Sequence, residues 1–388
     1  MDSGRRTLTV AAQLAVSESI KRYSAVAPGL PREAELLVDL QRAAASTQRR
    51  PLKTARQLML SGDGHTLDGF RYSINALRQM CRLLGRGFSQ AIFDLGAVIP
   101  SQSPPDDGPY DATMAVQWLN DLIRLRFEKR IKNYELIVGT KDKVIDGFVG
   151  ARYAYVSNMS FYERAKRVVR PTNCVFHEAV LASRRLLVRY RTEDPVFTLE
   201  GEKPEPFYGG FHFGNSEVGD CAVRTAVLLL RQRGDCKSVS SYSDNGRVLH
   251  IRGPQFEERL SAQLGAVVER IDEPRQLQTR LESLRSRPLG LVGGEEDVKR
   301  RLSALSRRLK QWGLQGTLAQ RVLGRVQLLG SSLADEKERE PVTAARSSRT
   351  EWDLFNAMTF MAKRQQLETQ ERLEQLAYQL LIGRKTIS

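Results

Sequence analysis

The spacing of apolar residues changes twice along this 388-residue chain, and this change constrains the fold most. In the first third, apolar residues recur every three or four positions, as Leu77, Met80 and Leu84 do, which is typical of amphipathic helices. From Tyr134 to about residue 252, short apolar runs of strand length alternate with turn signals. After Gln255 the helical spacing returns. We therefore expect an α+β fold, with a central antiparallel β-rich core flanked by N- and C-terminal helices.

Several segments of the centre carry specific strand signals. Residues 134–138 and 144–149 bracket a polar turn and predict a hairpin. Asn245-Gly246 predicts a second hairpin, because both residues of its turn need positive φ. Residues 151–156 favour a further strand, and the apolar run 223–230 is either a buried strand or a helical segment.

These patterns divide the chain into five regions. We expect an N-terminal helical region (1–110), a β-rich core domain (111–255), a basic helical region (256–330), a linker (331–350) and a C-terminal helix (351–388). Gly383 is placed to end that last helix.

Composition limits the class of protein. With 60 Lys and Arg against 45 Asp and Glu, the net charge is +15, which favours a polyanionic partner. The chain is 41% hydrophobic, enough to build a core, and it has no apolar run of about 18 residues that would span a membrane. Four scattered cysteines favour free thiols in a reducing compartment, so we expect a cytoplasmic protein that does not associate with membranes.

Basic and aromatic residues are interleaved between positions 152 and 191. Proteins that hold single-stranded nucleic acid combine a basic groove for the phosphates with aromatic rings that stack on bases. The alternative is a solvated strand face with tyrosines in the core. We predict a nucleic-acid-binding groove made of Arg152, Tyr153, Tyr155, Arg164, Lys166, Arg167, Arg170, Arg184, Arg185, Arg189 and Arg191.

Two helices outside the core are also candidates for contacts with partners. A basic helix carries Arg300, Arg301, Arg307 and Arg308, which either face phosphates or are simply solvated. The leucines and methionines of the C-terminal helix either pack against the chain's own core or make a homo-oligomer.

No enzyme signature stands out. The chain has neither a P-loop nor a G-x-S-x-G elbow. Cys174 and His177 have C-x-x-H spacing, but structural zinc sites usually show two such close pairs. Glu217 and Asp220 are a candidate carboxylate pair for a metal-dependent nuclease, although surface acids explain them better. We expect no cofactor and no metal site.

Several short segments together resemble a known family. They are Leu-Asn-Asp-Leu at 119–122, the hairpin after Tyr134, Gly-Ala-Arg-Tyr-Ala-Tyr-Val-Ser-Asn at 150–158, Phe-His-Phe-Gly-Asn-Ser-Glu-Val-Gly at 211–219, and Trp-Asp-Leu-Phe-Asn-Ala-Met-Thr at 352–359. In this order they resemble the phage- and plasmid-associated family catalogued as domain of unknown function 932, over roughly residues 70–359. Family members often have Cys-Asn-Gly after the apolar strand, whereas here Lys237 follows Cys236.

The resemblance implies a bacterial or phage-infected host cell, a role in replication, recombination or host takeover, and an outline similar to that of single-strand annealing proteins. Our leading hypothesis is a mobile-element protein that holds or anneals single-stranded DNA, with nucleic acid as its partner. The alternatives are a metal-dependent nuclease and a multimeric phage structural or host-modulating protein.

Overall fold

The computed structural model describes most of the chain. The described residues are 15–16, 20–25, 29–61, 65–84, 112–129, 131–182, 184–200, 204–219, 221–231, 237–240, 247–291, 294–328, 349–362, 365 and 367–385. The predicted Asn245-Gly246 hairpin and nearly all of the 331–350 linker lie outside them.

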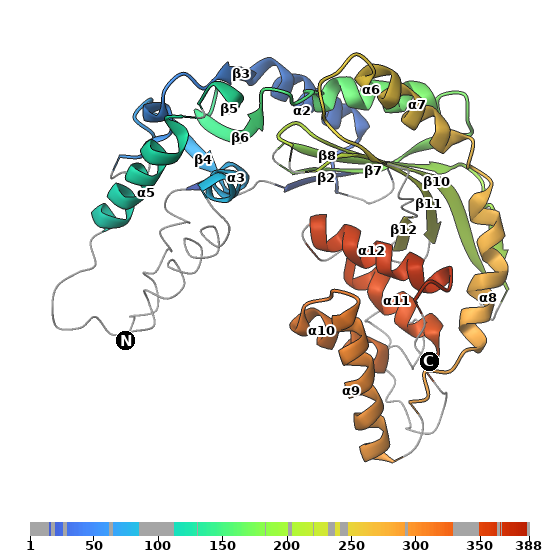
Figure 1. Cartoon of the computed structure of the whole chain (residues 1–388). Helices are drawn as coiled ribbons and strands as arrows, with labels where there is room; N and C mark the ends of the chain where they lie inside the picture. Colours follow the sequence, from blue (N-terminus) through green and yellow to red (C-terminus); the bar gives the residue numbers. More distant parts are fainter. Residues whose placement is uncertain are drawn as a thin grey trace.

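The predicted α+β fold is confirmed, and its strands form two sheets (Figure 1). The larger sheet is antiparallel and has the order β12-β11-β10-β8-β7-β2, with β13 beside β11 and β9 beside β10. Its strands are β2 (Ile20–Ser24), β7 (Cys174–Ala182), β8 (Arg185–Thr192), β9 (Phe197–Leu199), β10 (Glu205–Ser216), β11 (Val223–Arg231), β12 (Lys237–Ser240) and β13 (Arg247–Val248). The ambiguous run 223–230 is therefore a strand, β11, and it is buried on both faces.

The smaller sheet has the order β1-β4-β6-β5-β3. Its strands are β1 (Ala15–Val16), β3 (Thr47–Pro51), β4 (Arg71–Ser73), β5 (Tyr134–Gly139) and β6 (Val144–Gly150). β5 and β6 form the predicted antiparallel hairpin. α3 (Ile74–Leu84) and α5 (Ala112–Phe127) pack with this sheet around Tyr72, Leu77 and Ile123.

Helices cover both faces of the larger sheet (Figure 1). α2 (Glu33–Ser46), α6 (Asn158–Val169) and α7 (Phe256–Val268) share one core with it. On the other side lie α8 (Gln278–Ser286), α9 (Glu295–Gln311), α10 (Gly316–Leu328), α11 (Glu351–Ala362) and α12 (Leu367–Leu381), whose core includes Phe207 and Leu229 of the sheet. Short 3-10 turns occur at η1 (Ala55–Leu58), η2 (Ile131–Asn133) and η3 (Glu273–Leu277).

Three local predictions need correction. The N-terminal region is not only helical, because β2, β3 and β4 come from it and pair with strands far along the chain. Residues 151–156 form no strand and make only the isolated pairing of Tyr153 with Ile251. The C-terminal helix is two helices, α11 and α12, and Gly383, with φ of 72°, follows the second.

Burial explains why the C-terminal region folds back on itself. A single long helix can bury only one stripe of side chains, whereas α11 and α12 each have an apolar surface that must be buried. Leu354 and Met358 of α11, and Leu373 and Leu376 of α12, are fully buried within the chain. These leucines and methionines therefore pack against the chain's own core, which is the first of the two alternatives given for this region.

Candidate functional site

The arginines of β8 lie inside the protein. Arg189 has no exposed side-chain surface and pairs with Glu178 at 2.6 Å and with Glu374 of α12 at 2.5 Å. Arg185 pairs with Glu371 of α12, which also accepts from Arg224 of β11 at 2.6 Å. These residues attach α12 to the sheet, so the prediction that Arg185 and Arg189 line an open groove is wrong for this conformation.

A buried histidine sits within this ion-pair cluster. Arg189 Nε donates to His212 Nδ1 at 3.4 Å, so that nitrogen carries no proton. Burial, and next the positive charge of Arg189, lower the pKa of His212 well below its ordinary value. His212 is therefore a neutral structural residue at physiological pH.

Arg184 joins the two sheets instead of lining a groove. Its guanidinium group contacts Asp146 of β6 at 2.7 Å and Glu217 at 3.6 Å. Burial raises the pKa of both carboxyl groups, and the charge of Arg184 opposes that rise. Glu217 also accepts a hydrogen bond from the Asn158 backbone N–H at 2.6 Å.

These contacts bear on the nuclease alternative. Glu217 is buried and already engaged, and Asp220 lies outside the described residues. Nowhere in the described part of the chain do three or more Cys, His, Asp or Glu side chains gather as a metal site would need. Cys174 and Cys221 form no disulfide within the described part of the chain.

The tyrosines of the predicted groove pack inward. The hydroxyl group of Tyr153 donates to the Ser216 carbonyl at 2.6 Å, and its ring stacks on His250 with centroids 4.9 Å apart. Tyr155 is half-buried, with Arg49 over its ring at 5.7 Å, and burial raises the pKa of its hydroxyl group. Tyr153, which is buried, cannot stack on a base in this conformation.

The remaining members of that cluster lie at or near the surface, and four of them, Arg164, Lys166, Arg167 and Arg170, are on α6 or at its C-cap. Arg164 pairs with Glu257, and Lys166 pairs with Glu33 at 2.8 Å. Arg191 lies over the ring of Tyr208 at 4.5 Å. Arg152, Arg167 and Arg170 are exposed. The eleven-residue set predicted from the sequence therefore does not form one continuous groove.

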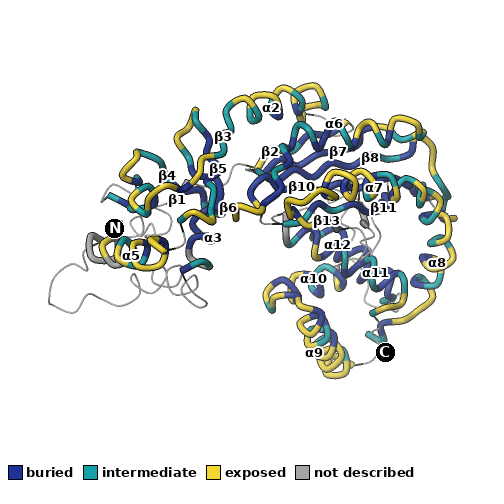
Figure 2. Tube along the Cα trace, turned by 45° about the horizontal axis from the view of Figure 1, so that its top comes forward, coloured by how far each residue is buried: buried dark blue, intermediate teal, exposed yellow. Residues whose placement is uncertain are grey.

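The basic helix α9 is different, because its arginines remain on the surface. Leu305 and Leu309 anchor one side of α9 in the C-terminal core, so its other faces are solvated. Figure 2 shows α9 largely exposed, in contrast to the buried strands β7 and β8. The first turn is acidic and the last turn basic, an order that favours the helix dipole.

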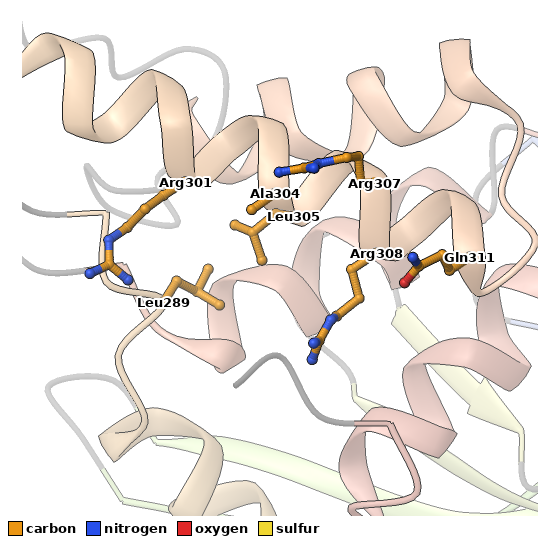
Figure 3. Close-up of a pocket in the computed structure, with 7 residues that line it drawn as sticks. All are labelled: Leu289, Arg301, Ala304, Leu305, Arg307, Arg308 and Gln311. Carbon is orange, nitrogen blue, oxygen red and sulfur yellow. The ribbon is translucent and has the colours of Figure 1, made fainter.

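Three of these arginines share one pocket of about 280 Å³ (Figure 3). Arg301, Ala304, Leu305 and Arg308 recur at helical spacing and so lie on one stripe of α9. The pocket is lined by Leu289, Arg301, Ala304, Leu305, Arg307, Arg308 and Gln311. It therefore has an aliphatic floor and guanidinium groups at its rim.

Pairing separates the cations of α9 into two groups. Lys299 contacts Glu295 at 2.6 Å and Arg300 contacts Asp297 at 3.8 Å, both within the first turns of the helix. Among the residues that the structure describes, Arg301 and Arg307 have no such carboxylate partner. Arg301 and Arg307 are thus the cations of this face that remain available to an external anion.

The loop before α9 shapes one side of this pocket. Gly290 has φ of 66°, and a Cβ there would lie 2.5 Å from Arg301 Nη1. The positive φ favours glycine at this position, and the loop backbone lies close to the Arg301 guanidinium group. The sequence identified the arginines but not Leu289 or Gln311, which carry no signal of their own and join the pocket through tertiary packing.

Comparisons with known proteins add no relative. No family model, curated protein or solved structure matches this chain. In the described part of the chain, none of the helices has the length and apolar character needed to cross a bilayer.

Proposed function

We propose that this protein binds nucleic acid, holding single-stranded DNA by its phosphates along the exposed face of α9. The observation that carries the proposal is the convergence of Arg301, Arg307 and Arg308 on one pocket. Arginine suits this role because its planar guanidinium group binds phosphate with two parallel hydrogen bonds. The net charge of +15 adds a long-range attraction for the same ligand.

The geometry of the helix supports contact with several phosphates. Arg301 and Arg308 are seven residues apart, which is about 10 Å along the axis of a helix. This distance covers about three nucleotide steps of a stacked strand, at roughly 3.4 Å per step. The floor of Leu289 and Leu305 offers no aromatic ring for stacking, so we expect binding with little dependence on base sequence.

A salt series tests the proposal. We expect filter binding of a labelled single-stranded oligonucleotide to weaken steeply as salt increases, because each phosphate contact releases counterions. Arg301→Ala with Arg307→Ala should make the slope of log affinity against log salt shallower by about 1.4, which is two contacts at roughly 0.7 each. The matched control is Lys299→Ala with Arg300→Ala, since those cations already have carboxylate partners.

Three results would contradict the proposal. One is a flat salt dependence for the unsubstituted protein, and another is an unchanged slope in the Arg301 and Arg307 double variant. The third is cleavage of the labelled strand when magnesium is added, which would favour the nuclease alternative over a protein that only binds DNA. The affinity for duplex DNA, measured in parallel, shows whether this face prefers single-stranded or double-stranded DNA.

A further inference from the structure

Two bulky aliphatic side chains project into solvent on the opposite side of the larger sheet from α9. Leu249 is 63% exposed and Ile251 is 57% exposed. Their neighbours Val248 and His250 are buried, as expected where side chains alternate along an extended segment. Exposed aliphatic residues that lie together, unlike scattered ones, often mark a site of interaction.

Backbone pairing holds these side chains in place. The N–H of Ala154 donates to the His250 carbonyl at 3.1 Å, and the N–H of Arg252 donates to the Arg152 carbonyl at 2.6 Å. Between them, Tyr153 pairs with Ile251. The outward direction of Leu249 and Ile251 is therefore imposed by this pairing and is available to a partner without rearrangement.

Helix α7 makes the other wall of a groove of about 680 Å³. Gln255, Arg259, Ala262 and Ala266 line it from one face of the helix, at separations of three or four residues. Because the side chains of Ala262 and Ala266 are small, they leave space between α7 and the Leu249 segment, and the groove is open enough to take a peptide chain there.

The rim of the groove is positively charged. Arg252 and Arg259 line it, and Arg152 is joined to Arg252 through the backbone hydrogen bond given above. None of the three arginines makes an ion pair with a residue that the structure describes. The acid Glu257 of α7 does not line the groove and is paired with Arg164.

From this complementarity we propose that the groove docks an acidic peptide segment of a partner protein, one that carries aliphatic or aromatic side chains between its carboxylates. Its apolar side chains would cover Leu249 and Ile251, and its carboxylates would pair with Arg252 and Arg259. Nucleic acid suits the site less well, because a phosphate backbone would leave the exposed side chains of Leu249 and Ile251 uncovered, whereas Leu289 and Leu305 of the α9 pocket are already buried. The surface is separate from the α9 pocket, so the inference does not depend on the proposed function.

The test uses the full chain and a labelled synthetic peptide in which aspartate alternates with leucine and phenylalanine. Fluorescence anisotropy should show saturable binding. Leu249→Ser with Ile251→Ser, and separately Arg252→Glu with Arg259→Glu, should each weaken it about tenfold or more, as loss of central contacts does. The matched control is Leu125→Ser on α5, which changes a leucine that is 71% exposed elsewhere. Because all five positions are exposed, the variants should melt at the temperature of the unsubstituted protein.

Four outcomes would overturn the inference. The first is absence of saturable binding, and the second is equal affinity for a peptide with serine in place of leucine and phenylalanine. The third is a loss of oligonucleotide affinity in the Leu249 and Ile251 variant larger than that in the Arg301 and Arg307 variant, which would assign the groove to nucleic acid. The fourth is a fall in particle mass by light scattering in the same variant, which would assign the groove to a second copy of the chain.

Discussion

Strand β8 has three arginines in eight residues and helix α9 has four in seventeen, but most of those of β8 are buried in ion pairs whereas those of α9 lie at the surface. The β8 cations Arg185 and Arg189 are neutralised by carboxylates that reach the sheet from α12. Arg189 and Glu374 are 185 residues apart in the sequence. On α9, the acids lie only in the first turn, so Arg301 and Arg307 keep their charge exposed. The comparison teaches that a cluster of arginines is a binding surface only where no distant segment supplies its counter-charges.

Removal of a β8 cation should have the largest effect. Arg189→Met leaves Glu374 buried without its main partner, and breaking a buried pair in this way costs about 3–5 kcal/mol in the free energy of unfolding. Urea denaturation measures it. The α9 counterpart, Arg307→Met, should change that free energy by less than about 0.5 kcal/mol.

A double variant sharpens this result. Arg189→Met combined with Glu374→Leu removes both charges and should recover part of the lost stability, because apolar replacements of a buried pair are often tolerated. Equal urea midpoints for Arg189→Met and Arg307→Met would show that the two regions do not differ as described.

The next largest effect should come from low pH, which should destabilise the region around β8 through His212. The pKa of His212 is lowered in the folded protein, so below about pH 6.5 the unfolded chain binds a proton that the folded chain does not. Stability is therefore lost as pH falls, by up to about 1.4 kcal/mol per pH unit from this residue. His212→Gln should lack that part of the acid dependence. Parallel stability profiles for the two proteins between about pH 7 and 5 would refute a buried neutral histidine.

Substitution of Tyr153, one of the tyrosines of the predicted groove, should have the smallest effect on stability. Tyr153→Phe removes the hydrogen bond to Ser216 and should lower the free energy of unfolding by about 1 kcal/mol. Affinity for single-stranded DNA should not change, because the ring faces His250. A clear loss of DNA affinity with unchanged stability would instead show that Tyr153 contacts DNA.

Local pattern was sufficient for several elements of the fold. The β5–β6 hairpin and helices α2, α3, α5, α7 and α9 follow from apolar spacing, which depends on neighbours within a few residues. β2, β3 and β4 were missed because they are three to five residues long and exist through pairing with distant strands. The division between α11 and α12 was missed because apolar residues continue through both.

The candidate site was predictable only in part. Arg301, Arg307 and Arg308 were identified because they recur on a helix whose counter-charges are local. Leu249 and Ile251 were not, since an exposed leucine and a buried one look alike in a sequence. The basic stretch 152–191 was misjudged as a groove because Glu371 and Glu374 lie in a different part of the chain.

The sequence by itself determined the α+β class, the excess of positive charge and the helices with clear apolar stripes, because each depends on composition or on near neighbours. Only the tertiary structure decided which arginines are buried against carboxylates and which face solvent. Burial and ion pairing depend on segments brought together by folding, and in this protein those segments are up to 185 residues apart for one buried pair.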